Sequence, residues 1–226
     1  MREFLESLIP NVMADPKRFW DSIIATLQMT LWSGCVMFLM GLLLGIALTV
    51  TRAGGILQKK TVYQVLDKII NLCRSIPFVI FIALLLPVTK AIMGTKIGVR
   101  GVIVPLVAAS VPFFARQIEA ALAGVDRGLV EAAQAMGKSP LNIIFTVYLH
   151  ESVPAIARGT TITLINLIGL TAMAGYVGAG GLGDYAITWG YNYGRTDVIW
   201  VSVLAVVVIV SLIQLIGSII AKKNTH

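Results

Sequence analysis

Residues 22–50 read SIIATLQMTLWSGCVMFLMGLLLGIALTV, a run without a single charged side chain. A helix needs about 20 largely apolar residues to cross a bilayer, because the hydrocarbon offers no water to its backbone N–H and C=O groups. This run is long enough to cross as a tilted helix. Four further stretches share its character, so the sequence predicts an all-α, polytopic membrane helix bundle with five transmembrane spans. The five stretches lie near residues 22–50, 76–92, 99–115, 156–177 and 198–220.

The composition of the 226 residues agrees with a membrane protein. Hydrophobic residues make up 57% and charged residues only 13%, against about 25% charged in an ordinary soluble domain. The net charge of +7 could suggest nucleic acid, but Lys and Arg lie beside the apolar stretches and form no block longer than Lys59 and Lys60. We therefore expect a lipid bilayer and no nucleic acid as partner. No internal repeat or linker divides the chain, so we expect a single domain over residues 1–226.

The basic residues predict how the chain lies in the cell membrane. Assigning residues 52–74, 116–158 and the C-terminal Lys222 and Lys223 to the cytoplasm places eleven of the eighteen Lys and Arg there, as the positive-inside rule requires. The N-terminus is then outside and the C-terminus cytoplasmic, which fits an odd number of spans. Residues 1–20 mix acidic and basic side chains and lack an apolar core before a cleavage site, so we expect no signal peptide.

Three pairs of residues predict local contacts of the helices or the state of their side chains. Gly41 and Gly45 have the spacing at which helix backbones approach closely. Arg116 and Glu119 are three residues apart on one helical face, where a paired interfacial couple is the simplest interpretation. For Cys35 and Cys73 we expect two buried thiols rather than a disulfide.

Two motifs resemble a nucleotide-binding loop and a zinc-binding helix, but the residues around them do not fit either site. GAGGLG at residues 178–183 has the spacing of a dinucleotide-binding loop, but it follows an apolar span, and no Lys-Ser or Lys-Thr comes after it. HESVP at residues 150–154 begins like a zinc-binding helix, but Pro154 stands where the second His should be. The chain has only His150 and His226, and no close carboxylate pair inside a span. We therefore expect no catalytic site, no metal and no cofactor on this chain.

The segment between the third and fourth stretches is short and amphipathic, and residues 129–145 read LVEAAQAMGKSPLNIIF. Asp126 can cap a first helix, Gly137 suits the left-handed residue after its end, and Ser139 and Pro140 suit the start of a second helix. Polar and apolar side chains fall on opposite sides of the first helix. This pattern fits either a helix on lipid headgroups or close approach by a partner protein. The polar side carries Arg127, Glu131, Gln134 and Lys138, and the other side Leu129, Ala132, Ala133 and Met136.

The run EAA at residues 131–133, followed by Gly137, resembles the EAA-x-x-x-G signature of permease subunits of ABC importers. The family pattern continues as I-x-L-P, and His150 here takes the place of the Pro, which puts the backbone shape after the motif in question. Other stretches are similar in order and spacing to the methionine-uptake permeases of this family, over roughly residues 20–220. They read RSIPFVIFIALLLPVTKAIMGTKIG, VPFFARQIEAAL, TTITLINLIGLTAMAGYVGAGGLGDYAI and WGYNYGR.

The resemblance implies a permease subunit that imports D- or L-methionine by alternating access, driven by a separate ATPase subunit. It implies a homodimer, two cytoplasmic ATP-hydrolysing subunits and an extracytoplasmic substrate-binding protein. The segment between spans three and four would be the cytoplasmic coupling helix that docks on the ATPase subunit. The residues that match the coupling motif are Glu131, Ala132, Ala133 and Gly137.

The fourth apolar stretch is where we place the translocation pathway. It carries more polar and small residues than lipid contact needs, among them Asn166. In the resembled family a Met at the position that matches Met173 helps to form the gate. Helix packing uses the same kinds of residue and is the alternative interpretation of this stretch.

Other functions stay open at this point. The substrate could be another small amino acid or a short peptide. A secondary transporter or channel that works without ATP would need carboxylates or a proton relay within the membrane, and the predicted spans have no Asp or Glu near mid-depth. An intramembrane enzyme lacks a catalytic set of residues.

Overall fold

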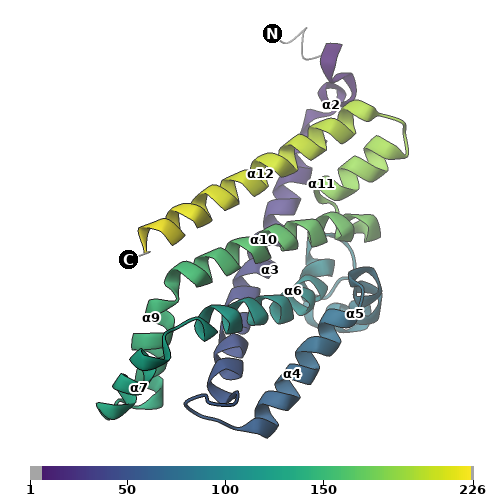
Figure 1. The fold of residues 1–226 in the computed structure, drawn as a ribbon. Coiled ribbons are helices and arrows are strands. Elements are labelled where there is room, and N and C mark those ends of the chain that lie inside the picture. The colour runs from purple at the N-terminus through teal and green to yellow at the C-terminus, as the bar shows by residue number, and fades with distance from the viewer. Residues whose placement is uncertain (1–6, 225–226) are drawn as a thin grey trace. The chain divides into compact units, whose positions relative to one another are not determined.

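The computed structural model describes residues 7–224, which are helical and contain no strand (Figure 1). Residues 1–6, part of the segment in which no signal peptide is expected, and residues 225–226 lie outside the described residues. The all-α prediction is confirmed for the described part. In chain order the helices are α2 (Pro10–Ala14), α3 (Pro16–Thr51), α4 (Lys60–Ser75), α5 (Phe78–Met93), α6 (Gly98–Ala123), α7 (Arg127–Ala135), α8 (Pro140–Ile143), the π-helix η1 (Ile144–Tyr148), α9 (Leu149–Glu151), α10 (Val153–Ala174), the π-helix η2 (Gly175–Ala179), α11 (Gly181–Asp184), the π-helix η3 (Tyr185–Tyr191) and α12 (Thr196–Lys223).

Four helical segments are long and apolar enough to cross a membrane, namely α3, α6, α10 with η2, and α12. The pair α4 and α5 passes the same test together but is bent by 109°. The described part therefore has four spans, or five with the bent pair, and the five predicted stretches coincide with α3, α5, α6, α10 and α12. Pro77 explains the break, because proline restricts the residue before it to extended backbone, and Ile76 has φ −87° and ψ 123°.

The chain packs as two compact units, and the long helices contribute residues to both. The first unit consists of the described parts of Met1–Cys35, Pro77–Val107 and Leu164–Ile213. The second consists of Val36–Ile76, Ala108–Thr163 and the described part of Gln214–His226. Each unit has its own cluster of buried apolar side chains.

In the first unit, the short helix α2 is fastened to η3 and α12. Val12 of α2, Tyr185 of η3 and Val198 of α12 are buried together. The backbone N–H and the side-chain amide of Asn11 both donate to the carboxylate of Asp197, each at 2.9 Å. Burial raises the pKa of the Tyr185 phenol, so this residue remains a neutral core side chain. The apolar contact and the paired hydrogen bonds together fix α2 against the start of α12.

In the second unit, Gly41 and Gly45 bring α3 and α6 into close contact. A Cβ atom at Gly41 would lie 2.6 Å from Cδ1 of Phe114, and one at Gly45 would lie 2.5 Å from Cβ of Ile118 and 2.8 Å from the carbonyl oxygen of Ala115. Glycine alone permits this approach of two helix backbones. The helix contact predicted from the spacing of these glycines is confirmed.

The two cysteines are free thiols, but they differ in exposure. Cys73 on α4 is partly buried, whereas Cys35 on α3 is exposed. The prediction of two buried thiols is therefore wrong for Cys35. The reason is that α3 has a side that no other part of the described chain covers, and Cys35 lies on it.

Candidate functional site

The amphipathic segment in the second unit forms two short helices, each with the cap that the sequence predicts. α7 begins after Asp126, whose carboxylate accepts a hydrogen bond from the N–H of Gly128 at 2.7 Å. α8 begins after Ser139, whose hydroxyl accepts from the N–H of Asn142 at 3.4 Å, with Pro140 at the first position. These caps pair N–H groups that the first turn of a helix leaves without an intrahelical acceptor.

Gly137 forms the turn between the two helices. Its φ of 74° lies in the left-handed region, which costs any residue with a Cβ atom about 1 to 2 kcal/mol. The N–H of Gly137 donates to the carbonyl of Gln134 at 2.9 Å, and the N–H of Lys138 donates to the carbonyl of Ala133 at 3.1 Å. This pair of bonds is a Schellman motif. No atom lies within 4 Å of a Cβ added at Gly137, so the need for glycine is conformational and not steric.

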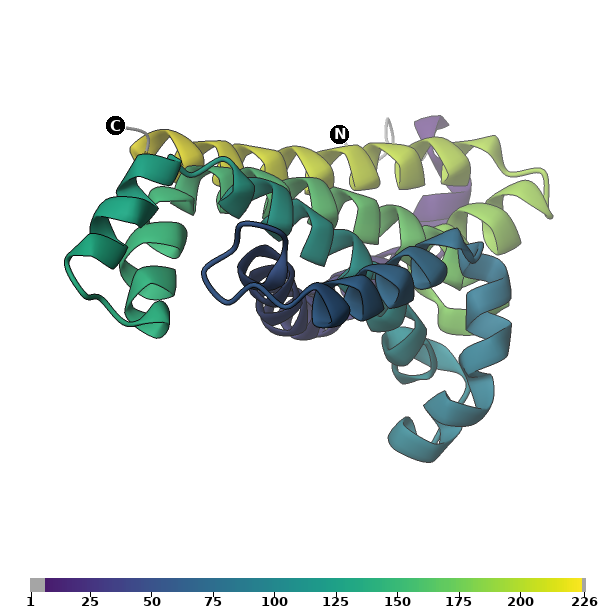
Figure 2. The same cartoon turned by 60° about the horizontal axis from the view of Figure 1, so that its bottom comes forward.

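After this turn the chain runs back along α7, and we name residues 127–148 the glycine hairpin. α7 contacts η1, and the two segments lie side by side in both views (Figures 1 and 2). The buried residues of α7 are Val130 and Ala133, and those of η1 are Ile144, Val147 and Tyr148. The hairpin therefore has an apolar interior of its own.

The outward side of the glycine hairpin is also apolar. Ala132 is exposed there, whereas Ala133 is only 2% exposed. The sequence places Ala132 and Ala133 together on the apolar side of this helix, but in the structure only Ala132 faces outward. Ala133 is three residues after the buried Val130 and therefore lies on the same inward side of α7. Sequence reasoning also missed the contribution of the returning segment to this outer side. The large exposed side chains are Leu129 (47%), Met136 (69%), Leu141 (67%) and Phe145 (66%).

Glu131 lies on the polar side of α7. Its carboxylate is 3.0 Å from Nε of Arg127, and the side chains are 63% and 80% exposed. An exposed ion pair of this kind contributes only about 0.3 to 0.5 kcal/mol, so Glu131 can exchange Arg127 for another partner at little cost. A cleft of about 240 Å³ lies beside it, lined in part by Arg52, Gln134 and Tyr148.

Asn166 and Met173, the two predicted pathway residues, share one exposed stripe in the first unit. Positions 166, 169, 173 and 176 are all exposed and repeat at the three- and four-residue spacing of one helix side. Met173 is 43% exposed, and a Cβ at Gly169 would meet nothing within 4 Å. A side-chain amide turned toward hydrocarbon would lose its hydrogen bonds. A stripe that contains Asn166 is therefore suited to water or to another chain.

The glycines of residues 175–183 hold helices together, which explains a motif that otherwise suggests phosphate binding. A Cβ at Gly183 of α11 would overlap backbone atoms of Ala172 in α10, and one at Gly175 would overlap the backbone nitrogen of Asp184. No strand precedes this run within residues 7–224. Three of its glycines have a positive φ, which lets the chain reverse between η2 and α11. They are Gly178, Gly180 and Gly181.

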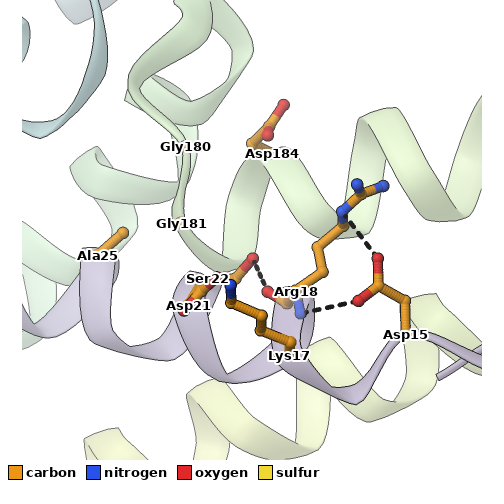
Figure 3. A pocket seen from close by; sticks show the side chains of 9 residues that line it. All are labelled: Asp15, Lys17, Arg18, Asp21, Ser22, Ala25, Gly180, Gly181 and Asp184. Carbon is orange, nitrogen blue, oxygen red and sulfur yellow. Dashed lines mark hydrogen bonds and ion pairs between the residues drawn. The ribbon is translucent and has the colours of Figure 1, made fainter. Parts of the chain in front are cut away.

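A charged pocket of about 430 Å³ lies in the first unit, at the start of α3 and the turn into α11 (Figure 3). Nε of Arg18 is 3.3 Å from the carboxylate of Asp15, and its guanidinium carbon lies 3.6 Å from the centre of the Trp189 ring. Asp184 accepts a hydrogen bond from the hydroxyl of Thr188 at 2.7 Å. Arg18, Asp15 and Asp184 therefore already have partners within the chain, and we interpret the pocket as a polar surface at helix ends. Its lining also includes Lys17, Asp21, Ser22, Ala25, Gly180 and Gly181.

The histidine motif at residues 150–154 spans a helix boundary. α9 ends at Glu151, Ser152 follows with φ −92° and ψ 0°, and α10 begins at Val153. His150 is exposed, and Pro154 occupies the second position of α10. Within the part of the chain that the structure describes, no group of three His, Cys, Asp or Glu side chains could hold a metal ion.

Comparison with known proteins gives one family and several close relatives. The model of the family described as binding-protein-dependent transport system inner membrane component matches residues 37–224. The probable D-methionine transport system permease protein MetI of Vibrio cholerae is 43% identical over 201 residues, which cover 89% of this chain and 89% of the relative. The methionine import system permease protein MetP of Bacillus subtilis is 44% identical over 215 residues, which cover 95% and 96%.

The fold is similar to that of solved transporters. A chain of the inward-facing MetNI methionine ABC transporter, in its native crystal form, matches with a TM-score of 0.91 at 40% identity, over 94% of this chain and 99% of that chain. An amino acid ABC transporter crystallised with histidines matches with a TM-score of 0.77 at 19% identity, over 95% and 98%. At that lower identity the likeness concerns the fold alone. The resemblance to methionine-uptake permeases expected from the sequence is confirmed.

Proposed function

This chain belongs to the family of inner membrane components of binding-protein-dependent transport systems, and we propose that it is the permease subunit of an ABC importer for methionine. As a member of that family it is a multi-pass membrane protein. The glycine hairpin is the observation that carries the proposal, because it presents an exposed docking surface at the EAA motif of a chain whose relatives are named for methionine transport. Both compact units together form one transmembrane domain in this proposal.

The glycine hairpin is the proposed docking site for the ATP-hydrolysing subunit. Gly137 sets the turn, and the small exposed side chain of Ala132 permits close approach of a partner. Glu131 offers an exposed carboxylate, and Ala133 supports α7 from inside the hairpin. ATP is hydrolysed on that separate subunit in this proposal, and we expect no cofactor on the permease chain.

The proposed assembly contains two copies of this chain, two ATPase subunits and an extracytoplasmic substrate-binding protein. The exposed stripe with Asn166 and Met173 supports the homodimer, since a second copy would cover an amide that lipid cannot satisfy. We propose that this stripe lines the translocation pathway and that Met173 forms the gate. A flexible thioether side chain can close a narrow opening and repack when it opens.

The orientation in the membrane follows from the same assembly. An ATPase subunit in the cytoplasm requires the glycine hairpin to be cytoplasmic, and the excess of Lys and Arg in residues 52–74, 116–158 and 222–223 agrees with this placement. We therefore propose that the N-terminus lies outside and the C-terminus in the cytoplasm.

The proposed mechanism is alternating access. ATP binding draws the two ATPase subunits together, and the hairpins docked on them are displaced as rigid elements. The spans that continue from each hairpin then change position, so that the pathway opens to one side of the membrane at a time. ATP can shift the equilibrium between the two states only by the difference in its affinity for them. In this proposal the contact between the hairpin and the ATPase subunit transmits that shift to the spans.

Two alternatives differ from this proposal in their predictions. An importer of another small amino acid or a short peptide would have the same architecture, so competition between substrates separates it from a methionine importer. A secondary transporter would work without ATP and would depend on ionisable groups inside its spans. The ionisable pair in α6, Arg116 and Glu119, is already engaged in a hydrogen bond at 2.6 Å.

We expect the chain to copurify with an ATPase subunit and to show no saturable ATP binding when purified alone. Reconstituted with that subunit and its binding protein in liposomes, it should import methionine only when ATP is enclosed with the ATPase. Omission of the binding protein is the control. Uptake that proceeds without ATP, or ATP binding by the isolated chain, would contradict the proposal.

Gly137→Val should weaken association with the ATPase subunit by about tenfold. Valine disfavours the left-handed turn by about 1 to 2 kcal/mol, so the free chain relieves the strain by leaving the turn, and docking must restore it. The site is open to solvent, so no clash adds to this cost. Gly137→Asn is the matched variant, since Asn adopts the left-handed conformation more readily. Copurification and uptake measure both variants. Equal behaviour of the Val and Asn variants would show that backbone strain at this turn does not govern docking.

A further inference from the structure

Arg116 connects α4 and α6 through a network of hydrogen bonds in the second unit. One terminal nitrogen of its guanidinium donates to Oε2 of Glu119 at 2.6 Å. The other donates to the carboxylate of Asp67 and to the side-chain oxygen of Asn71, the latter at 3.1 Å. The hydroxyl of Tyr63 donates to Oε1 of Glu119 at 3.2 Å. Three residues of α4 and two of α6 thus meet at a single guanidinium and its paired carboxylate.

The charges of this network are largely withdrawn from solvent. The side chains of Arg116, Glu119 and Asp67 are 19%, 14% and 33% exposed. An ionised group in a helix that can cross a membrane is costly unless it is paired. The planar fork of a guanidinium binds carboxylates in a fixed geometry, so pairing here also fixes how far α4 can slide or rotate against α6.

Apolar packing between the same helices does not impose that register. Ile70 of α4 and Ala115 of α6 are buried together with Leu48 of α3, and Tyr63 and Leu66 pack against them. Such contacts stabilise in proportion to area and have little directionality. The hydrogen bonds of Arg116 therefore fix the register of α4 against α6, which the apolar cluster alone does not.

The network lies close in sequence to the glycine hairpin. α6 ends at Ala123, and only residues 124–126 separate it from α7. The hydroxyl of Ser152 donates to the carbonyl of Ala121 at 3.2 Å, which ties the end of α6 to the segment that follows the hairpin. A displacement of the hairpin is therefore passed to the end of α6 first.

We propose that Arg116 is a positioning residue that makes α4, the end of α6 and the glycine hairpin move as one body. This inference rests on the proposed function, since it assigns a route by which docking of the ATPase subunit reaches a further helix. Without the guanidinium, α4 would still pack through its apolar residues but would no longer follow the hairpin. Arg116 acts through these helices and is not part of the transport pathway.

Transport per ATP hydrolysed is the quantity that tests this role. In the reconstituted complex, Arg116→Gln should lower the number of substrate molecules moved per ATP by about tenfold, a typical size for coupling between sites. Assembly with the ATPase subunit and hydrolysis of ATP should persist. Arg116→Lys keeps the charge without the fork and should give an intermediate ratio. The control is Arg100→Gln, which removes an exposed arginine from the same helix.

A distance measurement separates positioning from simple stabilisation. Spin labels at Lys68 of α4 and Gln134 of α7, both exposed, should keep one distance with and without ATP in the wild-type complex. In Arg116→Gln the distance should change when ATP binds. A wild-type distance that itself changes with ATP, or a variant with the wild-type transport ratio and an unchanged distance, would overturn the inference.

Tyr63→Phe covers the case in which Arg116→Gln fails to fold, because it removes one hydrogen bond and keeps the ring in the apolar cluster. We expect a smaller fall in transport per ATP, and a wild-type ratio in Tyr63→Phe would then count against the inference. A wild-type chain that binds no ATPase subunit would refute the proposed function itself. If the wild-type complex is functional but the Arg116 and Tyr63 variants move as many substrate molecules per ATP as the wild type, only the inference is refuted.

Discussion

Gly183→Ala is expected to lower the yield and the thermal stability of the folded protein strongly. The added methyl group would overlap the backbone of Ala172 in α10, and a backbone cannot rotate away as a side chain can. Overpacking of a core costs about 1 to 3 kcal/mol even where side chains yield. We expect the upper end of that range or more here, which lowers the folded-to-unfolded ratio by roughly 100-fold. The yield of monodisperse protein in detergent and its thermal unfolding measure this effect.

Gly34→Ala is the matched control in the same unit. Its methyl group would lie 3.2 Å from Cδ2 of Leu164, the mobile end of a side chain, and alanine favours a helix over glycine by about 1 kcal/mol. We therefore expect a normal yield. Gly175→Ala should behave like Gly183→Ala, because its methyl group would overlap the backbone nitrogen of Asp184. Normal yields from Gly175→Ala and Gly183→Ala would show that α10 and α11 are not packed this closely.

Features encoded within a few neighbouring residues could be predicted from the sequence. The caps at Asp126 and Ser139 and the left-handed turn at Gly137 depend on side chains and backbone of the same short segment. The spans are predictable because about 20 apolar residues in a row have few other uses. The contact at Gly41 and Gly45 follows from their spacing on one helix side.

Contacts between distant segments carried no comparable signal. Arg116 and Glu119 could be paired from their spacing, but Asp67 and Tyr63 approach them from a helix about 50 residues earlier in the chain. Nothing local to α4 indicates that contact. The charged pocket at Asp15 and Arg18 is similarly formed by segments far apart in sequence, the start of α3 and the turn into α11.

Exposure was the property that sequence patterns predicted least well. A helical wheel separates polar from apolar sides, but it does not say which apolar residues face the chain itself. In the glycine hairpin, Ala133 faces inward while Ala132 and Met136 face outward. Leu141 and Phe145 could have been recognised from their spacing of four residues. The sequence alone did not show that the returning segment packs beside α7, so it could not show that Leu141 and Phe145 share the outward side with Met136.

Met173→Ala should raise passive leak of small solutes through the transporter. Met173 is 43% exposed on the stripe that also carries Asn166, and in the proposed homodimer two copies of its side chain meet across the pathway. Truncation to Ala removes most of the apolar volume that excludes water. If this destabilises the closed state by about 1 to 2 kcal/mol, the open fraction rises about 5- to 30-fold. Solute efflux from liposomes without ATP measures the leak.

The same site permits a direct test of the dimer. Met173→Cys, in a chain with Cys35→Ser and Cys73→Ser, should cross-link to the second copy in the closed state and react with a small thiol reagent when the pathway is open. Met40 is the matched control, since it is also a methionine of similar exposure, 48%, on another spanning helix. Met40→Ala should leave the leak unchanged, and Met40→Cys should form no cross-link. If Met173 and Met40 variants behave alike in every nucleotide state, Met173 contacts lipid and the gate lies elsewhere. If only the Met173 variants leak and cross-link, the exposed stripe of α10 is the wall of the pathway, because a side chain facing lipid would produce neither effect.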